Sequence, residues 1–419
     1  MAGRYWVETL GCPKNQVDSD KLVGTLLADG MEAASAPDDA DVVVVNTCAF
    51  VEAARRESVD AVLGLAEGRR PGARLVVTGC MAERYGNELA EALPEADLVA
   101  GFGVPVTLDT LGGADTARLD LLNLPRPPAS APWAYVKVAE GCDRACGFCA
   151  IPSFRGRQRS RPLDAVLAEV DGLGVAEVVL VAQDLASYGR DMTGRGSGRM
   201  SRHRAILDLV PAVAARVRRV RLLYLYPSEL DDALVDTVCA TGVPYFDLSL
   251  QHVSRPLLAR MRRWGDGVRF LRRIAAIRRR EPDAAFRSSF IVGYPGETED
   301  DHDLLLAFLE EAQLDWAGFF AFSSEEGTYA AGLEDPVAAS LVDERLRELG
   351  ERQDAITASR RAALIGREVD VLVDEPGIGR SHREAPEIDG VVAVPLPLPV
   401  GQVARLTVTA SAGPDIEAA

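Results

Sequence analysis

At 419 residues the chain is long enough for two or three domains, and its net charge is −17. No stretch approaches about 18 uninterrupted apolar residues, so we expect no membrane span. The N-terminal segment carries charges throughout, so we expect no secretory signal. Seven cysteines are too few for a disulfide scaffold in a chain of this length, and their clustering indicates metal binding in a reducing cytoplasm.

The acidic charge is concentrated at the two ends of the chain. Residues 1–120 carry 10 Lys/Arg against 20 Asp/Glu, residues 121–365 carry 32 against 34, and residues 366–419 carry 4 against 9. A protein that binds nucleic acid through its phosphates needs basic surface. This balance therefore argues against a nucleic-acid substrate and favours a basic partner.

The first part of the chain alternates short apolar runs with helical patterns. Strands are predicted at residues 4–10, 42–45 and 75–77, and helices at 15–29, 51–67 and 82–93. The β-branched run from Val42 to Val45 is typical of a strand that is buried on both faces. The alternation predicts an α/β domain with a mostly parallel sheet over residues 1–120.

A cysteine directly follows each of these three strands, at Cys12, Cys48 and Cys80. The carboxyl ends of neighbouring parallel strands form the ligand crevice of an open sheet, so these thiols can meet at one point. The alternative is three buried cysteines that act as small apolar side chains. Their shared position in three consecutive strand–helix units favours a three-thiolate iron–sulfur site.

A proline-rich linker at residues 122–132 precedes a second series of strand–helix units. Strands are predicted at about 133–139, 177–182, 219–225, 245–250, 286–292 and 317–322, and helices at 163–172, 204–216, 231–240, 254–280 and 299–313. Six such units predict a partial (β/α)6 barrel, within a domain that spans residues 128–358. In barrels of this kind the chemistry lies at the C-terminal ends of the strands.

Three thiols, Cys142, Cys146 and Cys149, follow the first strand of this series in one short loop. Thiolates are soft ligands, and a tight group of them selects iron–sulfur clusters or zinc. The loop has no fourth cysteine and no histidine; the next cysteine, Cys239, lies in a helical pattern and is expected in the core. A cluster here would keep one iron position open, as catalytic metal sites do. The alternatives are a zinc site completed by a distant ligand, or three unrelated core cysteines.

Two further segments are expected at the same mouth. Gln183 and Asp184 end the second strand, and Gly293, Gly296 and Glu297 follow the fifth. We interpret these five residues as cofactor-binding, because glycines allow a ligand to approach the backbone closely. A plain tight turn is the alternative explanation for the glycines.

Other polar residues near the mouth each allow more than one interpretation. Gln251 and His252, at the end of the fourth strand, either line the mouth or act directly. Arg155, Arg157, Arg159 and Arg161 alternate, so an extended segment would put all four on one side, as a solvated edge, as charge balance for thiolates, or as a clamp for a carboxylate. The loop at residues 189–204 is assigned no role.

In the last part of the chain, the spacing of apolar residues changes from a helical pattern to every second residue. A charged helix is predicted from about 338 to 365, followed by strands at 368–374, 389–394 and 402–409, which predict a small β-barrel over residues 361–419. Small barrels often bind RNA. Residues 366–419, however, have a net charge of −5 and contain no aromatic residue on which a base could stack. We therefore expect the barrel to dock a basic protein through acids such as Glu384, Glu387 and Asp389.

The spacing of Cys142, Cys146 and Cys149 resembles that of the radical S-adenosylmethionine superfamily. The resemblance implies that the open iron of a four-iron cluster chelates S-adenosylmethionine. It also implies that the reduced cluster cleaves this cofactor to a 5′-deoxyadenosyl radical.

The whole chain is similar to the methylthiotransferase family of these enzymes. That family has a three-cysteine flavodoxin-like domain, a radical core and a terminal barrel of the TRAM type. The resemblance implies a second, auxiliary four-iron cluster at Cys12, Cys48 and Cys80. It also implies that sulfur bound there is transferred with a methyl group from a second S-adenosylmethionine.

One branch of the family, called RimO, modifies an aspartate of the small-subunit ribosomal protein twelve, and another modifies a tRNA adenosine. Residues 11–15 (Gly-Cys-Pro-Lys-Asn) and residues 385–390 (Ala-Pro-Glu-Ile-Asp-Gly) are similar to the ribosomal branch. The resemblance implies methylthio transfer to the aspartate β-carbon. The alternatives are a tRNA methylthiotransferase with the same chemistry, and an iron–sulfur scaffold or electron carrier without radical chemistry, which would not need an open iron.

Overall fold

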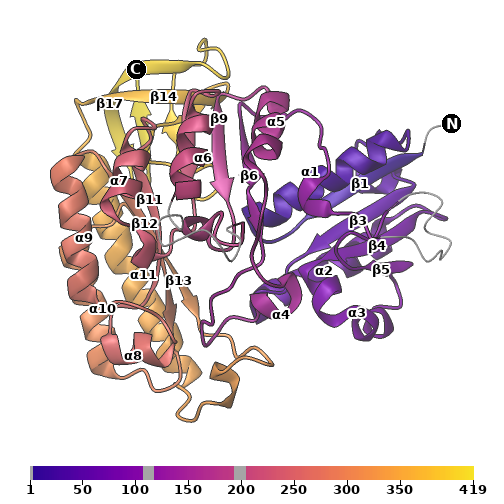
Figure 1. Cartoon of the computed structure of the whole chain (residues 1–419), viewed down its shortest axis with the longest axis horizontal. Helices are drawn as coiled ribbons and strands as arrows, with labels where there is room; N and C mark the ends of the chain where they lie inside the picture. Colours follow the sequence, from indigo (N-terminus) through magenta and orange to yellow (C-terminus); the bar gives the residue numbers. More distant parts are fainter. Residues whose placement is uncertain (1–2, 107–117, 193–203) are drawn as a thin grey trace. The chain divides into compact units, whose positions relative to one another are not determined.

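The computed structural model describes residues 3–106, 118–192 and 204–419 (Figure 1). The chain divides into two units. Residues 1–128, 139–144 and 149–169 form the first, and residues 129–138, 145–148 and 170–419 form the second. Within the described ranges, no helix has both the length and the apolar character that crossing a membrane requires. Most of the loop at residues 189–204 lies outside the described residues.

The first unit is built on a five-stranded parallel sheet of order β2-β1-β3-β4-β5. The strands are β1 (Arg4–Thr9), β2 (Glu32–Ala33), β3 (Val42–Thr47), β4 (Arg74–Gly79) and β5 (Leu98–Ala100). The valine run forms the central strand β3, whose side chains are all buried because helices cover both faces of the sheet. This strand order is that of a flavodoxin-like domain, so the predicted fold is confirmed.

The helices of this unit are α1 (Pro13–Ala28), α2 (Glu52–Gly68), α3 (Cys80–Ala92) and the short α4 (Ile151–Arg155), with 3-10 turns η1 (Pro37–Asp39) and η3 (Leu121–Asn123) and a hairpin of β7 (Ala139–Glu140) and β8 (Arg159–Ser160). Leu26 of α1 packs with Val44 on one face of the sheet. Val62 of α2 and Leu89 of α3 pack with Val45 on the other.

The linker that follows this sheet is fixed to it more firmly than a free spacer would be. It begins in η3, where Leu122 is buried. The ammonium group of the buried Lys21 donates to the carbonyls of Leu122 (2.6 Å) and Leu124 (3.1 Å) and pairs with Glu169 (3.2 Å). The expected stiff segment at residues 122–132 therefore starts with a turn that a buried cation holds against α1.

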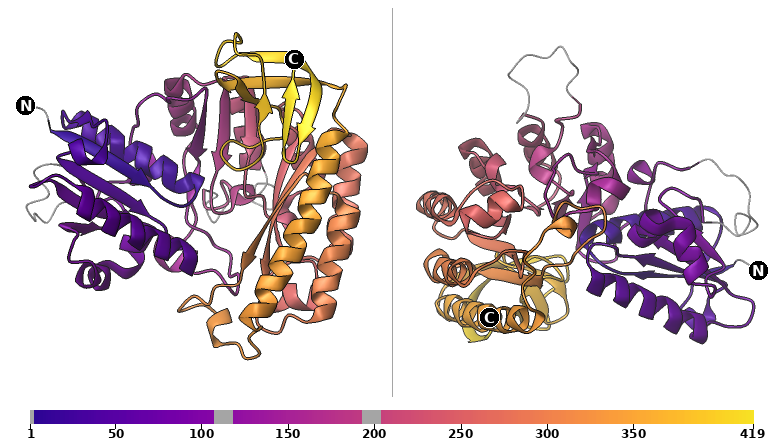
Figure 2. Two further views of the ribbon diagram at one scale, coloured as in Figure 1. Left: turned by 180° about the vertical axis from the view of Figure 1, so that it is seen from behind. Right: turned by 90° about the horizontal axis from the view of Figure 1, so that it is seen from below.

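The second unit contains the six predicted parallel strands, in two three-stranded sheets of order β10-β9-β6 and β11-β12-β13. The strands are β6 (Trp133–Lys137), β9 (Glu177–Val181), β10 (Arg219–Leu222), β11 (Tyr245–Gln251), β12 (Ala285–Val292) and β13 (Trp316–Ala321). An isolated parallel bridge between Leu225 and Leu248 joins the two sheets into one curved wall. Figure 2 shows helices on its outer side, as the predicted partial (β/α)6 barrel requires.

The helices of the second unit are α6 (Arg204–Ala214), α7 (Asp232–Cys239), α8 (Arg255–Arg260), α9 (Gly267–Arg280) and α10 (Glu299–Ala312), with 3-10 turns η4 (Leu185–Ser187), η5 (Pro227–Glu229) and η6 (Ala330–Gly332). The remaining helix, α5 (Leu163–Leu173), begins in the first unit and ends in the second. The single helix predicted at 254–280 is wrong, because α8 and α9 are separate. Gly265 has a φ of +115° between them, and the side chain of Asp266 caps α9 by accepting from the Arg269 amide (2.9 Å).

A long helix, α11 (Ala339–Ala362), leads into the terminal barrel. The barrel is closed in the order β14-β15-β16-β18-β17. Its strands are β14 (Glu368–Glu375), β15 (Ile378–Arg380), β16 (Val392–Ala393), β17 (Val403–Ala412) and β18 (Asp415–Ala418). The small β-barrel is confirmed, although five strands replace the three that the period-two pattern predicts. The two extra strands have three and four residues, which is too short for alternation to reveal them.

Buried ion pairs hold the barrel against the parallel strands of the second unit. Glu177 of β9 is fully buried and pairs with Arg221 of β10 (2.8 Å) and with Arg380 of the barrel (3.2 Å). Arg221 also donates to the carbonyls of Ser381 (3.3 Å) and His382 (2.9 Å). Since unpaired buried charges are costly, each of these groups requires the others to remain in place.

Two acids that were expected to face a partner are buried in this interface. Glu384 is fully buried and pairs with Arg361 of α11. The side chain of Asp389 is 2 % exposed, pairs with Arg287 (3.3 Å) and accepts from the Tyr245 hydroxyl (2.6 Å). The expectation that Glu384 and Asp389 dock a partner is therefore wrong; of the three acids, only Glu387 is exposed.

Replacing Glu177 by Gln is expected to lower the free energy of unfolding by about 3–5 kcal/mol, because Arg221 and Arg380 lose their buried carboxylate. Burial alone would raise the pKa of Glu177, but Arg380, Arg221 and Arg219 lower it to about 2. Its stabilising contribution is therefore complete above pH about 4.5 and is lost as the pH falls towards 2. Urea unfolding followed by tryptophan fluorescence measures both effects.

The matched control is Glu344→Gln on the exposed face of α11. An equal loss of stability in both variants would contradict the buried network.

Candidate metal centres

The first unit brings its three cysteines to one edge of the sheet. Cys12 follows β1 as the N-cap of α1, Cys48 follows β3, and Cys80 begins α3 directly after β4. These three strands are neighbours in the sheet. Gly11 (φ +97°) lies against them: a Cβ atom there would lie 2.9 Å from the Cys48 Cβ and 3.0 Å from its Sγ. Cys48 therefore packs so closely against the backbone of Gly11 that a side chain at position 11 would not fit.

Asn15 connects the strand ends that carry these thiols. Its side-chain amide donates to the carbonyls of Leu10 (2.9 Å) and Thr47 (3.0 Å). Its Oδ1 lies 3.4 Å from the Cys80 Sγ. Asn15 is fully buried, and its contacts with Thr47 and Cys80 are shielded from water. In the sequence, Asn15 is only part of a family motif. In the structure, it contacts the ends of β1 and β3 and the Cys80 thiol.

Arg155, at the end of α4, lies directly on this site. Its guanidinium donates to the Cys80 Sγ (3.0 Å) and to the Asn15 Oδ1 (2.6 Å), and it pairs with Asp18 (3.2 Å) and Glu140 (2.9 Å). Of the interpretations left open, charge balance for a thiolate fits Arg155, with Cys80 as the thiol.

The expected row of four arginines on one side of an extended segment is wrong. Arg155 ends a helix and is buried with Arg161, whereas Arg157 and Arg159 are exposed and pair with Asp143 and Asp120. The physical reason is that Arg155 belongs to α4, which starts with Pro152 near its first position and ends at Gly156 (φ +73°), so the turn at Gly156 separates Arg155 from the other three arginines.

The three thiols differ in acidity. Burial raises the pKa of Cys48 to about 12. Burial also raises the pKa of Cys80, although Arg155 opposes it. Burial would raise the pKa of Cys12 too, but Lys14, Arg155 and the backbone amides at the start of α1 outweigh it and lower the pKa. Metal binding at this edge must therefore release protons from Cys48 and Cys80.

The cysteine loop after β6 is shared between the two units, with Cys142 and Cys149 in the first and Cys146 in the second. In the first unit the Cys142 amide donates to the Gly156 carbonyl (3.1 Å), and the Arg144 amide donates to the Cys142 Sγ (3.4 Å). Gly141 (φ +76°) has no room for a side chain, because a Cβ would meet the Arg157 carbonyl.

In the second unit, Arg263 donates to the Cys146 Sγ (3.2 Å). The backbone of Gly147 bonds to the Met261 carbonyl (2.8 Å) and to the Ala330 amide (2.7 Å), which fixes the tip of the loop. No sequence signal identified Arg263, since it lies in the loop between α8 and α9 that was predicted to be helical.

The turn after β12 is held by its own carboxylate. Glu297 is buried; its Oε2 accepts from the amides of Gly293 (2.6 Å) and Tyr294 (3.2 Å), and its Oε1 pairs with Arg345 of α11 (2.9 Å). Gly293 and Gly296 have φ values of +80° and +82°. The tight-turn interpretation thus accounts for these residues, and their role in cofactor binding stays a prediction.

The remaining expected mouth residues are also engaged within the fold. Asp184 is buried and accepts from the Ser187 hydroxyl (2.7 Å), which shapes η4; Gln183 precedes it and is half-buried. His252 is buried and its Nδ1 accepts from the Ser254 amide (3.1 Å), while burial lowers its pKa to about 4. Cys239, expected in the core, is only half-buried at the end of α7.

The donor chemistry of both cysteine groups fits iron–sulfur clusters. Each provides three soft thiols, and a side chain at Gly11 would collide with the Cys48 Sγ. Among the described residues, no three His, Cys, Asp or Glu side chains converge tightly enough for a single metal ion. Cysteines around a four-iron cluster bind different irons, so they enclose the cluster and need not converge on one point. The six cysteines as ligands stay a prediction.

Comparison with known proteins identifies the family. Models of three families match the chain: uncharacterized protein family UPF0004 at residues 4–101, the radical SAM superfamily at 136–309, and the TRAM domain at 365–419. The chain is 42 % identical to ribosomal protein uS12 methylthiotransferase RimO of Moorella thermoacetica, over 97 % of this chain and 96 % of the relative. It is also 42 % identical to the protein of that name from an Anaeromyxobacter species, over 94 % and 88 %.

The chain belongs to the RimO methylthiotransferase family. As a RimO-family protein it is a transferase of the radical S-adenosylmethionine type, with two four-iron clusters and S-adenosylmethionine as cofactors, as expected from the sequence. The fold also resembles the radical S-adenosylmethionine methyltransferase TsrM of Kitasatospora setae. The TM-score is 0.52 and the identity 14 %, over 75 % of this chain and 72 % of TsrM.

Replacing Arg155 by Gln is expected to lower the free energy of unfolding by about 3–5 kcal/mol, because Asp18 and Glu140 lose a buried partner. Arg157→Gln, whose side chain is 91 % exposed, is expected to change it by less than about 0.5 kcal/mol. Urea unfolding of the metal-free chain followed by circular dichroism measures both. Equal effects at the two positions would contradict the buried pairing of Arg155 with Asp18 and Glu140.

Proposed function

We propose that this chain adds a methylthio group to the β-carbon of an aspartate in ribosomal protein uS12. The observation that carries this is the pair of separate three-cysteine groups in a chain that matches RimO relatives over nearly its whole length. The relatives are named as ribosomal protein uS12 methylthiotransferases, which supports uS12 as the substrate. Free thiols persist in a reducing compartment, which supports a cytoplasmic location for the enzyme.

Each cysteine group has its own place in this proposal. Cys142, Cys146 and Cys149 would hold the cluster with an open iron, and Cys12, Cys48 and Cys80 would hold the auxiliary cluster. When bound, the first cluster and S-adenosylmethionine supply a radical that removes hydrogen from an unactivated carbon, and the auxiliary cluster supplies sulfur.

The residues around these ligands prepare the sites. Arg155 places a permanent positive charge 3.0 Å from the Cys80 Sγ, which offsets the negative charge that thiolate ligands bring. Asn15 ties the ends of two strands together, so that the thiols at those ends keep their spacing. Arg263 gives Cys146 a charged hydrogen-bond donor in the second unit.

The exposed charge of the barrel fits a basic protein substrate. Its exposed acids are Glu368, Asp370, Glu375, Glu387 and Glu417, against two exposed arginines, Arg367 and Arg405. Arg380 and Arg383 are buried in ion pairs and are unavailable to a phosphate backbone. An acidic barrel steers a lysine- and arginine-rich partner and repels RNA.

Two triple variants separate the roles of the two groups. Changing Cys142, Cys146 and Cys149 to Ala is expected to abolish 5′-deoxyadenosine formation and to leave about four of the about eight irons. Changing Cys12, Cys48 and Cys80 to Ala is expected to retain 5′-deoxyadenosine but to stop methylthiolation. Iron analysis and mass spectrometry of both products provide the measurement. Retained cleavage in the first variant would refute the radical site.

A competition experiment tests the substrate. Purified reconstituted enzyme is offered uS12 and tRNA together, and mass spectrometry follows the methylthio group on each. We expect the group on the uS12 aspartate, and charge reversal at Glu368, Asp370 and Glu417 should slow that reaction at low salt. Charge reversal at Glu344 on α11 is the control. Modification of tRNA alone would favour the tRNA methylthiotransferase.

A further inference from the structure

One segment of the chain reverses its overall charge. Residues 255–280 contain ten arginines and one acid, Asp266, which gives a net charge of +9 within a chain of −17. The segment forms α8, the loop at residues 261–266 and α9. The expectation that the chain lacks basic surface is therefore wrong for this part of the second unit.

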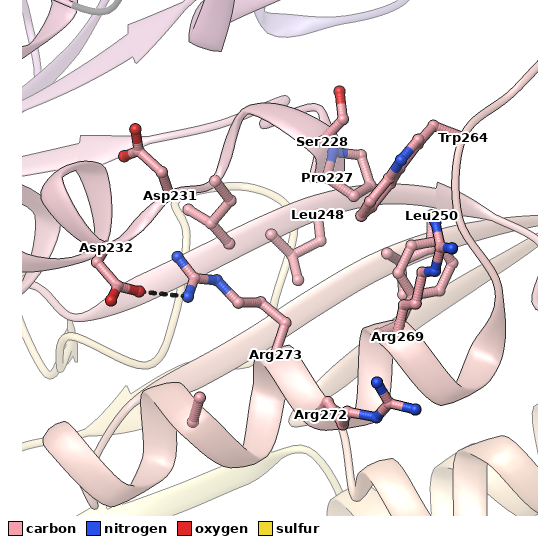
Figure 3. A pocket seen from close by; sticks show the side chains of 13 residues that line it. Pro227, Ser228, Asp231, Asp232, Leu248, Leu250, Trp264, Arg269, Arg272 and Arg273 are labelled. Carbon is pink, nitrogen blue, oxygen red and sulfur yellow. Dashed lines mark hydrogen bonds and ion pairs between the residues drawn. The ribbon is translucent and has the colours of Figure 1, made fainter.

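A pocket of about 610 Å³ lies against this segment (Figure 3). Its apolar lining comes from β11 and α9 and includes Leu248, Leu250 and Phe270. Its charged and aromatic lining is Trp264, Arg269, Arg272 and Arg273, which we call the arginine surface, with Asp231 and Asp232 at the other end. Trp264 is 43 % exposed, so part of its ring is available to a partner.

Within the part of the chain that the structure describes, two of the three arginines of the arginine surface are paired with acids, and the third is not. Arg273 pairs with Asp232 (2.6 Å), and Arg269 pairs with Asp266 (3.2 Å) while its guanidinium lies 5.6 Å from the Trp264 ring centre. Arg272 is exposed and has no carboxylate partner among the described residues. Its charge is free to meet an anionic partner.

The arginine surface begins next to a cluster ligand. Arg263 donates to the Cys146 Sγ (3.2 Å) and lies over the Tyr226 ring (4.4 Å), and the next residue along the chain is the exposed Trp264. The amide of Trp264 donates to the Tyr226 hydroxyl (3.4 Å). One continuous, hydrogen-bonded segment therefore leads from the thiol to the protein surface.

We propose that the arginine surface docks an acidic protein that carries single electrons. The inference rests on the proposed function, since only a cluster at Cys146 gives this surface an acceptor. In the transfer the carrier loses one electron and the cluster gains one, and no bond forms or breaks. Arginine and tryptophan are common at the centres of protein interfaces, and charge complementarity raises the rate of encounter. RNA would also fit the charge, but it gives no reason for the contact between Arg263 and Cys146.

The test uses the full reconstituted chain and flavodoxin, a small acidic flavoprotein that transfers single electrons. Titration calorimetry measures the affinity of oxidised flavodoxin at low and at high salt. 5′-Deoxyadenosine formation is then driven either by reduced flavodoxin or by dithionite. We expect Arg269→Glu/Arg272→Glu to weaken binding and to slow the flavodoxin-driven reaction by at least about tenfold at low salt, with the dithionite-driven reaction unchanged.

Two further variants sharpen the test. Arg347→Glu/Arg352→Glu on the exposed side of α11 makes the same charge change and is expected to leave both readouts unchanged. Trp264→Ala keeps every charge and is expected to weaken flavodoxin binding as well, because it removes the exposed aromatic contact.

The outcomes separate the two proposals. If dithionite drives no cleavage in the unaltered chain, the proposed function fails. If dithionite works and flavodoxin binds and reduces the Arg269/Arg272 variant as well as the unaltered chain, the docking proposal is overturned. The same holds if that variant loses affinity for a ribosomal RNA fragment but not for flavodoxin, which would assign the surface to RNA.

Discussion

The constraint on which this molecule depends is that parallel strands present all their carboxyl ends at one edge. In the first unit this brings Cys12, Cys48 and Cys80 from segments more than 30 residues apart to the ends of three neighbouring strands. In the second unit, β6 precedes the cysteine loop and β12 precedes the turn at Gly293, and both strands belong to the same curved wall. The chemistry is thus assembled from residues that are distant in sequence by one rule of strand direction.

Much of this arrangement could be predicted, because the relevant signals are local. The run from Val42 to Val45 can be buried only as a central strand, and a cysteine directly after such a strand must lie at the sheet edge. The features that could not be predicted depend on tertiary contacts. The burial of Arg155 and of Glu384 follows from partners 137 and 23 residues away, and alternation in sequence carries no record of such partners. The break between α8 and α9 had a signal in Gly265–Asp266, which the surrounding helical period outweighed.

The net charge of the chain is a poor guide to the charges that its surface exposes. The net value of −17 for the whole chain conceals the arginines of α8 and α9. It also counts Glu384 and Asp389 as surface acids, although both are neutralised inside the protein. Electrostatic recognition depends on which charges remain solvated and unpaired, and this is decided by the fold.

The buried pairs between the barrel and the parallel strands affect how such enzymes can be re-engineered. A barrel taken from a relative with another substrate would bring its own charges to a seat formed by Glu177, Arg221 and Arg287. Each mismatch would leave a charge without a partner in a dry environment. The terminal barrel therefore cannot be exchanged between relatives on its own. A functional chimera would have to transplant these three positions of β9, β10 and β12 together with the barrel.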